Sequence, residues 1–201
     1  MARPVVILFA RTPRLGLVKR RLASDIGDAA ALRFYRNQLT RVIRELAKLK
    51  NFEIIIALTP RHSRLQPRPR FHGISQSKGD LGQRMTRCFN MFRRRQVILI
   101  GADIPDLNAA IIRSAARALK SHDAAFGPAA DGGYYLVAMG AKRAASPFAN
   151  VRWSSPHALA DTLTNFRHHR IATLKTLQDV DTGADLKATL ISSLRRTPKY
   201  P

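Results

Sequence analysis

The chain has 201 residues, and 35 Lys and Arg against 13 Asp and Glu give it a formal net charge of +22. This length is enough for one α/β domain with a full core, and no apolar run approaches the ~20 residues that span a bilayer. The single cysteine, Cys88, excludes an internal disulfide framework, so nothing indicates export. We therefore expect one domain over residues 1–201, in the cytoplasm, with a frayed tail from residue 196.

The basic charge favours anionic partners such as nucleotides, nucleic acid or acidic surfaces. The basic residues are scattered from Arg3 to Lys199 and form no block with interleaved aromatics that would stack on bases. We therefore prefer a solvated basic surface that contacts nucleic acid only non-specifically, with a non-catalytic nucleic-acid or nucleotide binder as the rival. Because acidic residues are scarce, each Asp is more informative than usual.

The apolar run over residues 5–10 predicts a first strand, and a loop marked by Pro13 and Gly16 follows it. Four cations surround this loop: Arg11, Lys19, Arg20 and Arg21. Backbone amides and point charges at the carboxyl end of a strand can cradle a phosphate. The spacing of a Walker loop is absent, so the signal is weak by itself.

The three-four spacing of apolar residues predicts a helix over 28–50. Strands are predicted over 53–59 and 71–75, joined by a Pro- and Arg-rich loop at 60–69. Asp80 and Gln83 have the spacing of a capping box that opens a helix to about residue 94, with Cys88 on its apolar face.

Asp80 has a second interpretation besides that cap. It could lie at the edge of a loop beside a ligand, with Gly79 and Gly82 allowing close approach of the backbone.

Four consecutive aliphatic residues at 97–100 predict a central parallel strand that is buried on both faces. Asp103 follows its carboxyl end, where ligands bind in open α/β sheets. A carboxylate there suits a divalent metal, and we favour this role over a cap for the next helix.

Asp131 precedes two glycines in a tight turn, which alone would explain it as well as a functional role would. Ser155 is predicted to cap a helix, and Thr182 with Asp185 fits a capping box that leaves Asp181 outside it. The other predicted elements are helices over 108–121 and 156–166 and strands over 123–128, 134–139 and 171–174.

Six motifs, in this order, resemble the small bacterial nucleotide-diphospho-sugar transferase-like proteins, which are also labelled radical-SAM/selenodomain-associated transferases. The matching pieces are Phe9-Ala10-Arg11 with Pro13, Gly16, Val18, Lys19, Arg21 and Leu22; Gly79-Asp80-Leu81-Gly82 with Arg84-Met85; Ile100-Gly101 with Asp103, Pro105 and Leu107; Gly127-Pro128 with Asp131-Gly132-Gly133-Tyr134-Tyr135-Leu136; Trp153-Ser154; and Asp179-Val180-Asp181-Thr182 with Asp185-Leu186. The family is distantly similar to molybdenum-cofactor nucleotidyltransferases and phospholactate guanylyltransferases.

The resemblance implies a glycosyltransferase-A type fold, a Rossmann-like three-layer α/β/α sandwich with a mixed, mostly parallel sheet. It implies Mg²⁺ or Mn²⁺ on Asp103 and Asp181, and Asp131 across the cleft toward the second substrate. The nucleotide-binding residues that it implies are Arg11, Gly16, Lys19, Arg21, Gly79, Asp80 and Gly82. The sequence departs from the family at Arg20, where Thr is usual, and at Ala102, where Ser or Thr is usual.

We therefore expect a metal-dependent transferase that moves a glycosyl or nucleotidyl group from a nucleotide donor to a small acceptor. Lys19 and Arg21 would stabilise charge on the leaving group, and Asp131 would serve as base in sugar transfer. A guanylyl- or cytidylyltransferase acting on a phosphorylated acceptor is the alternative, because an acceptor phosphate needs no such base. The acceptor, the base and the oligomeric state stay open.

Overall fold

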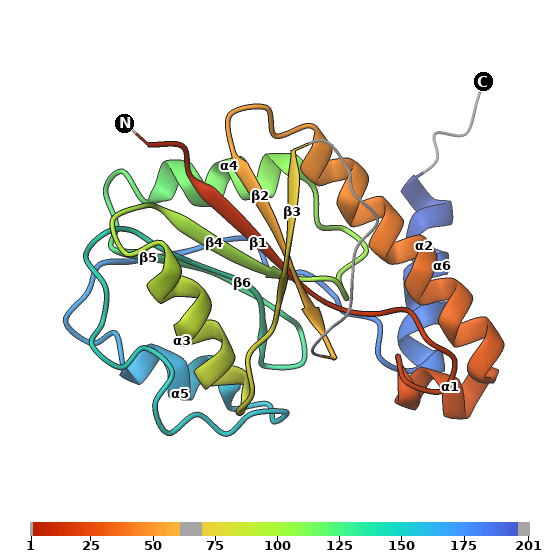
Figure 1. Cartoon of the computed structure of the whole chain (residues 1–201). Coiled ribbons are helices and arrows are strands. Elements are labelled where there is room, and N and C mark those ends of the chain that lie inside the picture. The colour runs from red at the N-terminus through yellow and green to blue at the C-terminus, as the bar shows by residue number, and fades with distance from the viewer. Residues whose placement is uncertain (1, 61–69, 197–201) are drawn as a thin grey trace.

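The computed structural model describes residues 2–60 and 70–196, so most of the predicted loop at 60–69 and the tail beyond residue 196 lie outside the described residues. The described chain forms seven strands and six helices (Figure 1). The strands are β1 (Val5–Arg11), β2 (Glu53–Thr59), β3 (Phe71–Ser75), β4 (Val97–Gly101), β5 (Ala124–Pro128), β6 (Tyr134–Met139) and β7 (Ile171–Thr173). The helices are α1 (Arg20–Ile26), α2 (Asp28–Ala47), α3 (Leu81–Met91), α4 (Ala109–Ala118), α5 (Ala158–Thr164) and α6 (Gly183–Arg196).

All seven strands form one sheet in the order β3-β2-β1-β4-β6-β5-β7. Its pairs are parallel except those of β6, which runs antiparallel to both β4 and β5. The predicted mixed, mostly parallel sheet is thus confirmed. Strand β4 is central, but it is parallel to only one of its neighbours because the turn at 129–133 reverses the chain between β5 and β6.

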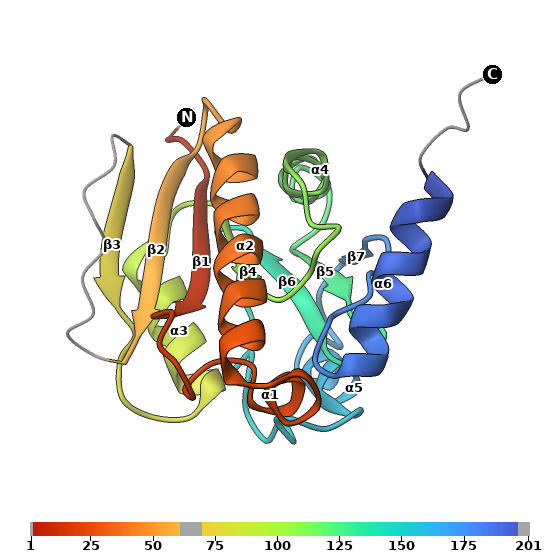
Figure 2. The same cartoon turned by 90° about the vertical axis from the view of Figure 1, so that its right-hand side faces the viewer.

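Helices cover both faces of the sheet and give the predicted three layers (Figure 2). Helices α2 and α4 pack on one face, where one cluster of buried residues joins them to alternate residues of the strands. Helices α3 and α5 pack on the other face against the intervening strand residues. The aliphatic run of β4 is buried on both sides for this reason.

Two local predictions of helix starts have different outcomes. Asp80 accepts a hydrogen bond from the Gln83 amide, and the Gln83 side chain accepts one from the Asp80 amide, so the predicted capping box of α3 is confirmed. The prediction that Ser155 caps α5 is wrong, because the helix begins at Ala158 after His157. The Ser155 hydroxyl instead donates to the Arg152 carbonyl in the preceding turn.

None of the helices in residues 2–60 and 70–196 has the length and apolar character that a membrane crossing requires.

Candidate active site

The side chain of Lys19 joins two predicted site residues. Its ammonium lies 2.9 Å from Asp103 Oδ1 and 2.7 Å from Asp181 Oδ1. The Lys19 side chain is only 5% exposed, whereas those of Asp103 and Asp181 are 52% and 40% exposed. The two carboxylates therefore converge on the buried Lys19 ammonium, and both are themselves about half exposed to solvent.

Backbone geometry sets Lys19 in this position. The residue adopts a left-handed conformation (φ 49°, ψ 49°) directly before α1, and the buried residues Val18 and Leu22 anchor the turn on both sides. A non-glycine residue in this region costs about 1 kcal/mol or more and is held by its surroundings. Here the two ion pairs of the ammonium, with Asp103 and Asp181, help to hold Lys19 in this conformation.

A second segment carries Asp181 to the same point. The Asp185 carboxylate accepts hydrogen bonds from the amides of Asp181 and Thr182, and the Thr182 hydroxyl accepts one from the Asp185 amide. This is the predicted capping box of α6, and it fixes Asp181 just outside the helix.

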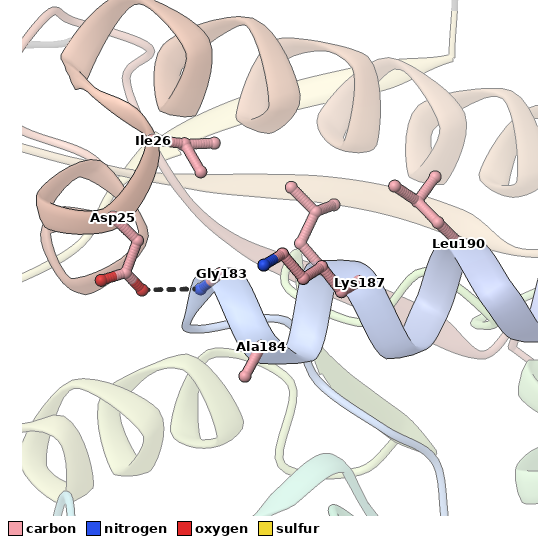
Figure 3. Close-up of a pocket in the computed structure, with 7 residues that line it drawn as sticks. Asp25, Ile26, Gly183, Ala184, Lys187 and Leu190 are labelled. Carbon is pink, nitrogen blue, oxygen red and sulfur yellow. Dashed lines mark hydrogen bonds between the residues drawn. The ribbon is translucent and has the colours of Figure 1, made fainter.

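Helices α1 and α6 are also tied to each other. Asp25 at the end of α1 accepts a 2.7 Å hydrogen bond from the Gly183 amide, at the start of α6 (Figure 3). Beside this bond lies a groove of about 250 Å³, whose apolar lining includes Ile26 and Leu190. The contact fixes the segments of Lys19 and Asp181 relative to each other.

The charges in this cluster support one another. Burial alone would lower the pKa of Lys19, but the carboxylates of Asp103 and Asp181 outweigh it, so the pKa is raised above its usual value. Lys19 is therefore a permanent ammonium at neutral pH. Burial raises the pKa of the nearby Asp179 carboxyl, and the charges of Asp131 and Asp181 raise it further.

The charges of Asp131, Asp181 and Lys19 all act on Asp179, so Asp179 couples Asp131 electrostatically to the other two residues. Asp131 itself is exposed on the turn between β5 and β6, and its Oδ1 accepts a 2.8 Å hydrogen bond from the Gly133 amide. The hydrogen bond within the turn thus accounts for one carboxylate oxygen of Asp131, and a role of Asp131 as a base stays a prediction.

Arg11 belongs to the same edge of the sheet. Phe9 is paired with Gly101 in parallel register, and Arg11 and Asp103 each follow two residues later, so both lie at the carboxyl ends of the neighbouring strands β1 and β4. The Tyr35 hydroxyl donates to the Arg11 carbonyl and accepts from its amide. Burial raises the pKa of Tyr35 to about 12, and both the Asp103 carboxylate and the Arg11 guanidinium act on it.

The glycines predicted to approach the nucleotide base have packing roles. Gly79 has a φ of 109°, and a Cβ there would meet the Gln83 side chain of the capping box. A Cβ on Gly82 would lie 2.9 Å from the Trp153 ring and 3.0 Å from Phe148. Together with Asp80 they shape the start of α3, and their contact with a nucleotide stays a prediction.

The remaining residues of the basic loop are open to solvent. Arg20 and Arg21 are exposed on α1, and Gly16 is exposed in the turn before it with a φ of 71°. Their role toward phosphate stays a prediction. Ala102, where the resembled family usually carries a hydroxyl, is 3% exposed and packs in the core cluster that contains α2 and α4 residues.

The donor set suits Mg²⁺ or Mn²⁺. Hard cations take oxygen ligands, and Mg²⁺ is commonly held by one or two carboxylates together with substrate phosphates. Asp103 and Asp181 supply such a pair, converging on the Lys19 ammonium. No group of three or more His, Cys, Asp or Glu side chains that could hold a metal occurs in residues 2–60 and 70–196, so the protein's share of a site would be these two carboxylates.

Sequence reasoning missed Gln76 near this edge, and it named Arg84 and Asp179 only as parts of the matching motifs, without a role in the site. Gln76 directly follows β3, so the rule that singled out Asp103 at the end of β4 would also have found it. Arg84 lies inside α3, and nothing in its spacing distinguishes it from the other arginines of the chain.

The fold matches solved structures. A candidate nucleotide-diphospho-sugar transferase from Desulfovibrio desulfuricans G20 is 28% identical, with a TM-score of 0.84 over 99% of this chain and 90% of that chain. A CMP:2-keto-3-deoxy-manno-octonic acid synthetase solved with CTP has a TM-score of 0.58 at 11% identity, over 96% of this chain and 99% of that chain. Rv0371c of Mycobacterium tuberculosis H37Rv, in complex with manganese, has a TM-score of 0.53 at 14% identity, over 94% of this chain and 99% of that chain.

The chain therefore has the nucleotide-diphospho-sugar transferase fold, which a cytidylyltransferase structure shares. It belongs to the DUF2064 family, described as an uncharacterized protein conserved in bacteria, whose model matches residues 42–155. No curated protein matches the sequence.

Proposed function

We propose that the chain is a metal-dependent transferase that binds a nucleotide donor and moves a glycosyl or nucleotidyl group to a small acceptor. One observation carries the proposal: the half-exposed carboxylates of Asp103 and Asp181, which are 78 positions apart in the chain, converge on the Lys19 ammonium at the carboxyl edge of the sheet. Ligands of open α/β folds bind at this edge. The likeness to a candidate sugar transferase and to a CTP-bound synthetase supports a nucleotide as the ligand.

In this proposal the two carboxylates hold Mg²⁺ or Mn²⁺, which would neutralise phosphate charge that grows on the leaving group. Lys19 remains protonated because Asp103 and Asp181 raise its pKa, so its ammonium can act as a fixed positive charge beside the phosphates. Arg11 lies at the carboxyl end of β1, the strand beside β4, and would approach the same phosphates. The exposed Arg21 would contribute charge from α1.

Asp131 distinguishes the two branches. Sugar transfer with inversion needs a base for the acceptor hydroxyl, and the exposed carboxylate of Asp131 is the candidate. Nucleotidyl transfer to a phosphate needs no base. Asp131→Asn should therefore abolish glycosyl transfer, but it should leave nucleotidyl transfer within a few-fold of the wild-type rate.

The first test is calorimetric titration of the purified chain with nucleoside triphosphates and nucleotide sugars, with Mg²⁺, with Mn²⁺ and with chelator. Salt of about 0.3 M screens the non-specific attraction of a +22 protein. We expect metal-dependent binding of one ligand, and its class selects the branch.

Asp103→Asn and Asp181→Asn should each remove the metal dependence. Asp123→Asn is the matched control, because Asp123 precedes β5 at the opposite edge of the sheet and bonds the Arg170 amide. Metal-independent binding, or unchanged binding in both site variants, would rule out the proposed metal site.

A further inference from the structure

A buried glutamine organises the edge beside the aspartate pair. Gln76 is 5% exposed, and its amide nitrogen donates to the carbonyls of Ala10 in β1 and Ala57 in β2. Its Oε1 accepts a 2.8 Å hydrogen bond from Arg84 Nη1. The Arg84 guanidinium is thereby fixed to the carboxyl ends of two central strands, although the residue comes from α3.

Arg84 lies close to the segment of a second cation, because Gln76 bonds both the Arg84 guanidinium and the carbonyl of Ala10, the residue before Arg11. Burial lowers its pKa, and the positive charge of Arg11 lowers it further, although Asp80 acts in the opposite direction. Neither Arg11 nor Arg84 forms an ion pair with a carboxylate within residues 2–60 and 70–196. Neutral oxygens of Asp80 and Gln76 therefore hold the Arg84 guanidinium beside the Arg11 segment, and an anion that bound both guanidinium groups would offset the repulsion between their charges.

We propose that Arg84 and Arg11 form a phosphate-binding subsite for the polyphosphate chain of the nucleotide, with Gln76 as the residue that positions Arg84. Guanidinium groups bind phosphate through paired, charge-assisted hydrogen bonds, so two of them suit a chain of linked phosphates. The name of the ligand rests on the proposed function, whereas the subsite rests on the arginines themselves.

Its place relative to the aspartates favours the donor's phosphates over an acceptor's. Arg11 and Asp103 lie at the carboxyl ends of neighbouring strands, and the Tyr35 phenol is under the influence of both charges. The subsite and the aspartate pair are therefore neighbours along one edge. One polyphosphate chain can meet the carboxylates' metal at one end and the arginines at the other.

The test uses inorganic pyrophosphate and orthophosphate as probes. The purified full-length chain is titrated by calorimetry in chelator and about 0.3 M salt, so that the aspartate pair takes no part. We expect pyrophosphate to bind at least tenfold more tightly than orthophosphate. We expect Arg84→Gln to weaken pyrophosphate binding at least tenfold. Equal affinities for the two anions would overturn the assignment to a polyphosphate.

Arg87→Gln is the matched control. Arg87 is exposed on the same helix, donates to the Lys78 carbonyl, and its loss changes the net charge by the same amount. Its substitution should alter pyrophosphate affinity less than twofold. Equal weakening in both variants, or none in Arg84→Gln, would overturn the subsite.

Two further variants make the result independent of folding and of the proposed function. Arg84→Lys keeps the charge but loses the paired donors of the guanidinium. The variant should fold, and its affinity for pyrophosphate should nevertheless be lower than that of the wild type. Asp103→Asn should lose metal-dependent nucleotide binding and retain pyrophosphate binding in chelator. Failure of the metal test with pyrophosphate binding intact would reject the transferase and leave the subsite standing.

Discussion

The Lys19 ammonium and the Asp181 carboxylate lie 2.7 Å apart although 162 positions separate them in the chain. The same ammonium contacts Asp103, so one side chain joins the loop after β1, the end of β4 and the segment before α6. A bound divalent cation and this ammonium would compete for the same carboxylates. Substitution of Lys19 should therefore change the affinities for metal and for nucleotide in opposite directions.

Lys19→Met should raise the affinity of the metal-free protein for Mn²⁺ and lower its affinity for the nucleotide. Removing the ammonium leaves two half-exposed carboxylates that repel each other and no longer have a competing cation, so we expect a gain of about 1 kcal/mol, or about fivefold, in Mn²⁺ affinity. Titration of Mn²⁺ alone and then with nucleotide separates the two effects. Lys187→Met, on exposed α6, should change neither affinity, and a loss of Mn²⁺ binding in Lys19→Met would contradict the prediction.

Gly82→Ala should destabilise the fold by about 1–3 kcal/mol, because its Cβ would be forced against the Trp153 ring and against the Cβ and backbone carbonyl of Phe148. The added Cβ would lie 2.9 Å from Trp153 and 3.0 Å from Phe148. Chemical denaturation measures the change, and Trp153 is the sole tryptophan, so its emission reports the local disturbance directly. Gly140→Ala is the control, with an ordinary 3.7 Å contact and an expected change within about 0.5 kcal/mol. Equal stability of the two variants would show that α3 shifts to accommodate the added methyl group.

Asp185→Ala should cost about 1 kcal/mol of stability at neutral pH, because it removes the carboxylate of the α6 capping box that accepts from the Asp181 and Thr182 amides. The Thr182 side chain, followed by backbone amides, holds the pKa of Asp185 below its usual value. The unfolded chain therefore binds this proton more readily than the folded one. The stability from Asp185 is fully present above about pH 3.9, the pKa of an unperturbed Asp, and is lost as the pH falls through the lowered value.

Denaturation curves of wild type and Asp185→Ala should therefore converge on acidification below about pH 4. Lys187→Ala, on the same helix, should show no such convergence. A difference between wild type and Asp185→Ala that is independent of pH would mean that the carboxylate's charge plays no part in the cap.

Cys88 should be unreactive in the folded protein. The residue is 4% exposed in α3, and burial raises the pKa of its thiol to about 11, so little thiolate exists at pH 8. A chromogenic disulfide reagent should titrate one thiol per chain in denaturant and almost none in buffer within the same period. Rapid reaction of the folded chain would mean that α3 opens readily from the sheet.

Much of the fold could be predicted because its signals are local. The aliphatic run before Asp103 predicted a buried strand, and the Asp80–Gln83 and Thr182–Asp185 spacings predicted two capping boxes that the structure contains. Ser155 misled because a serine before a proline also stabilises a turn, which is what it does here.

The site itself depends on relationships that no local pattern encodes. The contact of Lys19 with Asp103 and Asp181 requires a left-handed turn and the docking of α1 on α6. Arg84 reaches the sheet edge only because Gln76 is buried between Ala10 and Ala57 and holds it there. Spacing along a chain cannot report such meetings, since they arise from tertiary packing.

The reversal of β6 has a consequence for how such a protein can diverge. Three of the parallel strands, β1, β3 and β4, lead to Arg11, Gln76 and Asp103, which are assigned to the donor side, whereas Asp131 lies on the turn of the β5–β6 hairpin. The hairpin is one continuous stretch of chain, so its tip can change without disturbing the register of the parallel strands. Exchange of this hairpin between family members would be the shortest route to a new acceptor with the old nucleotide.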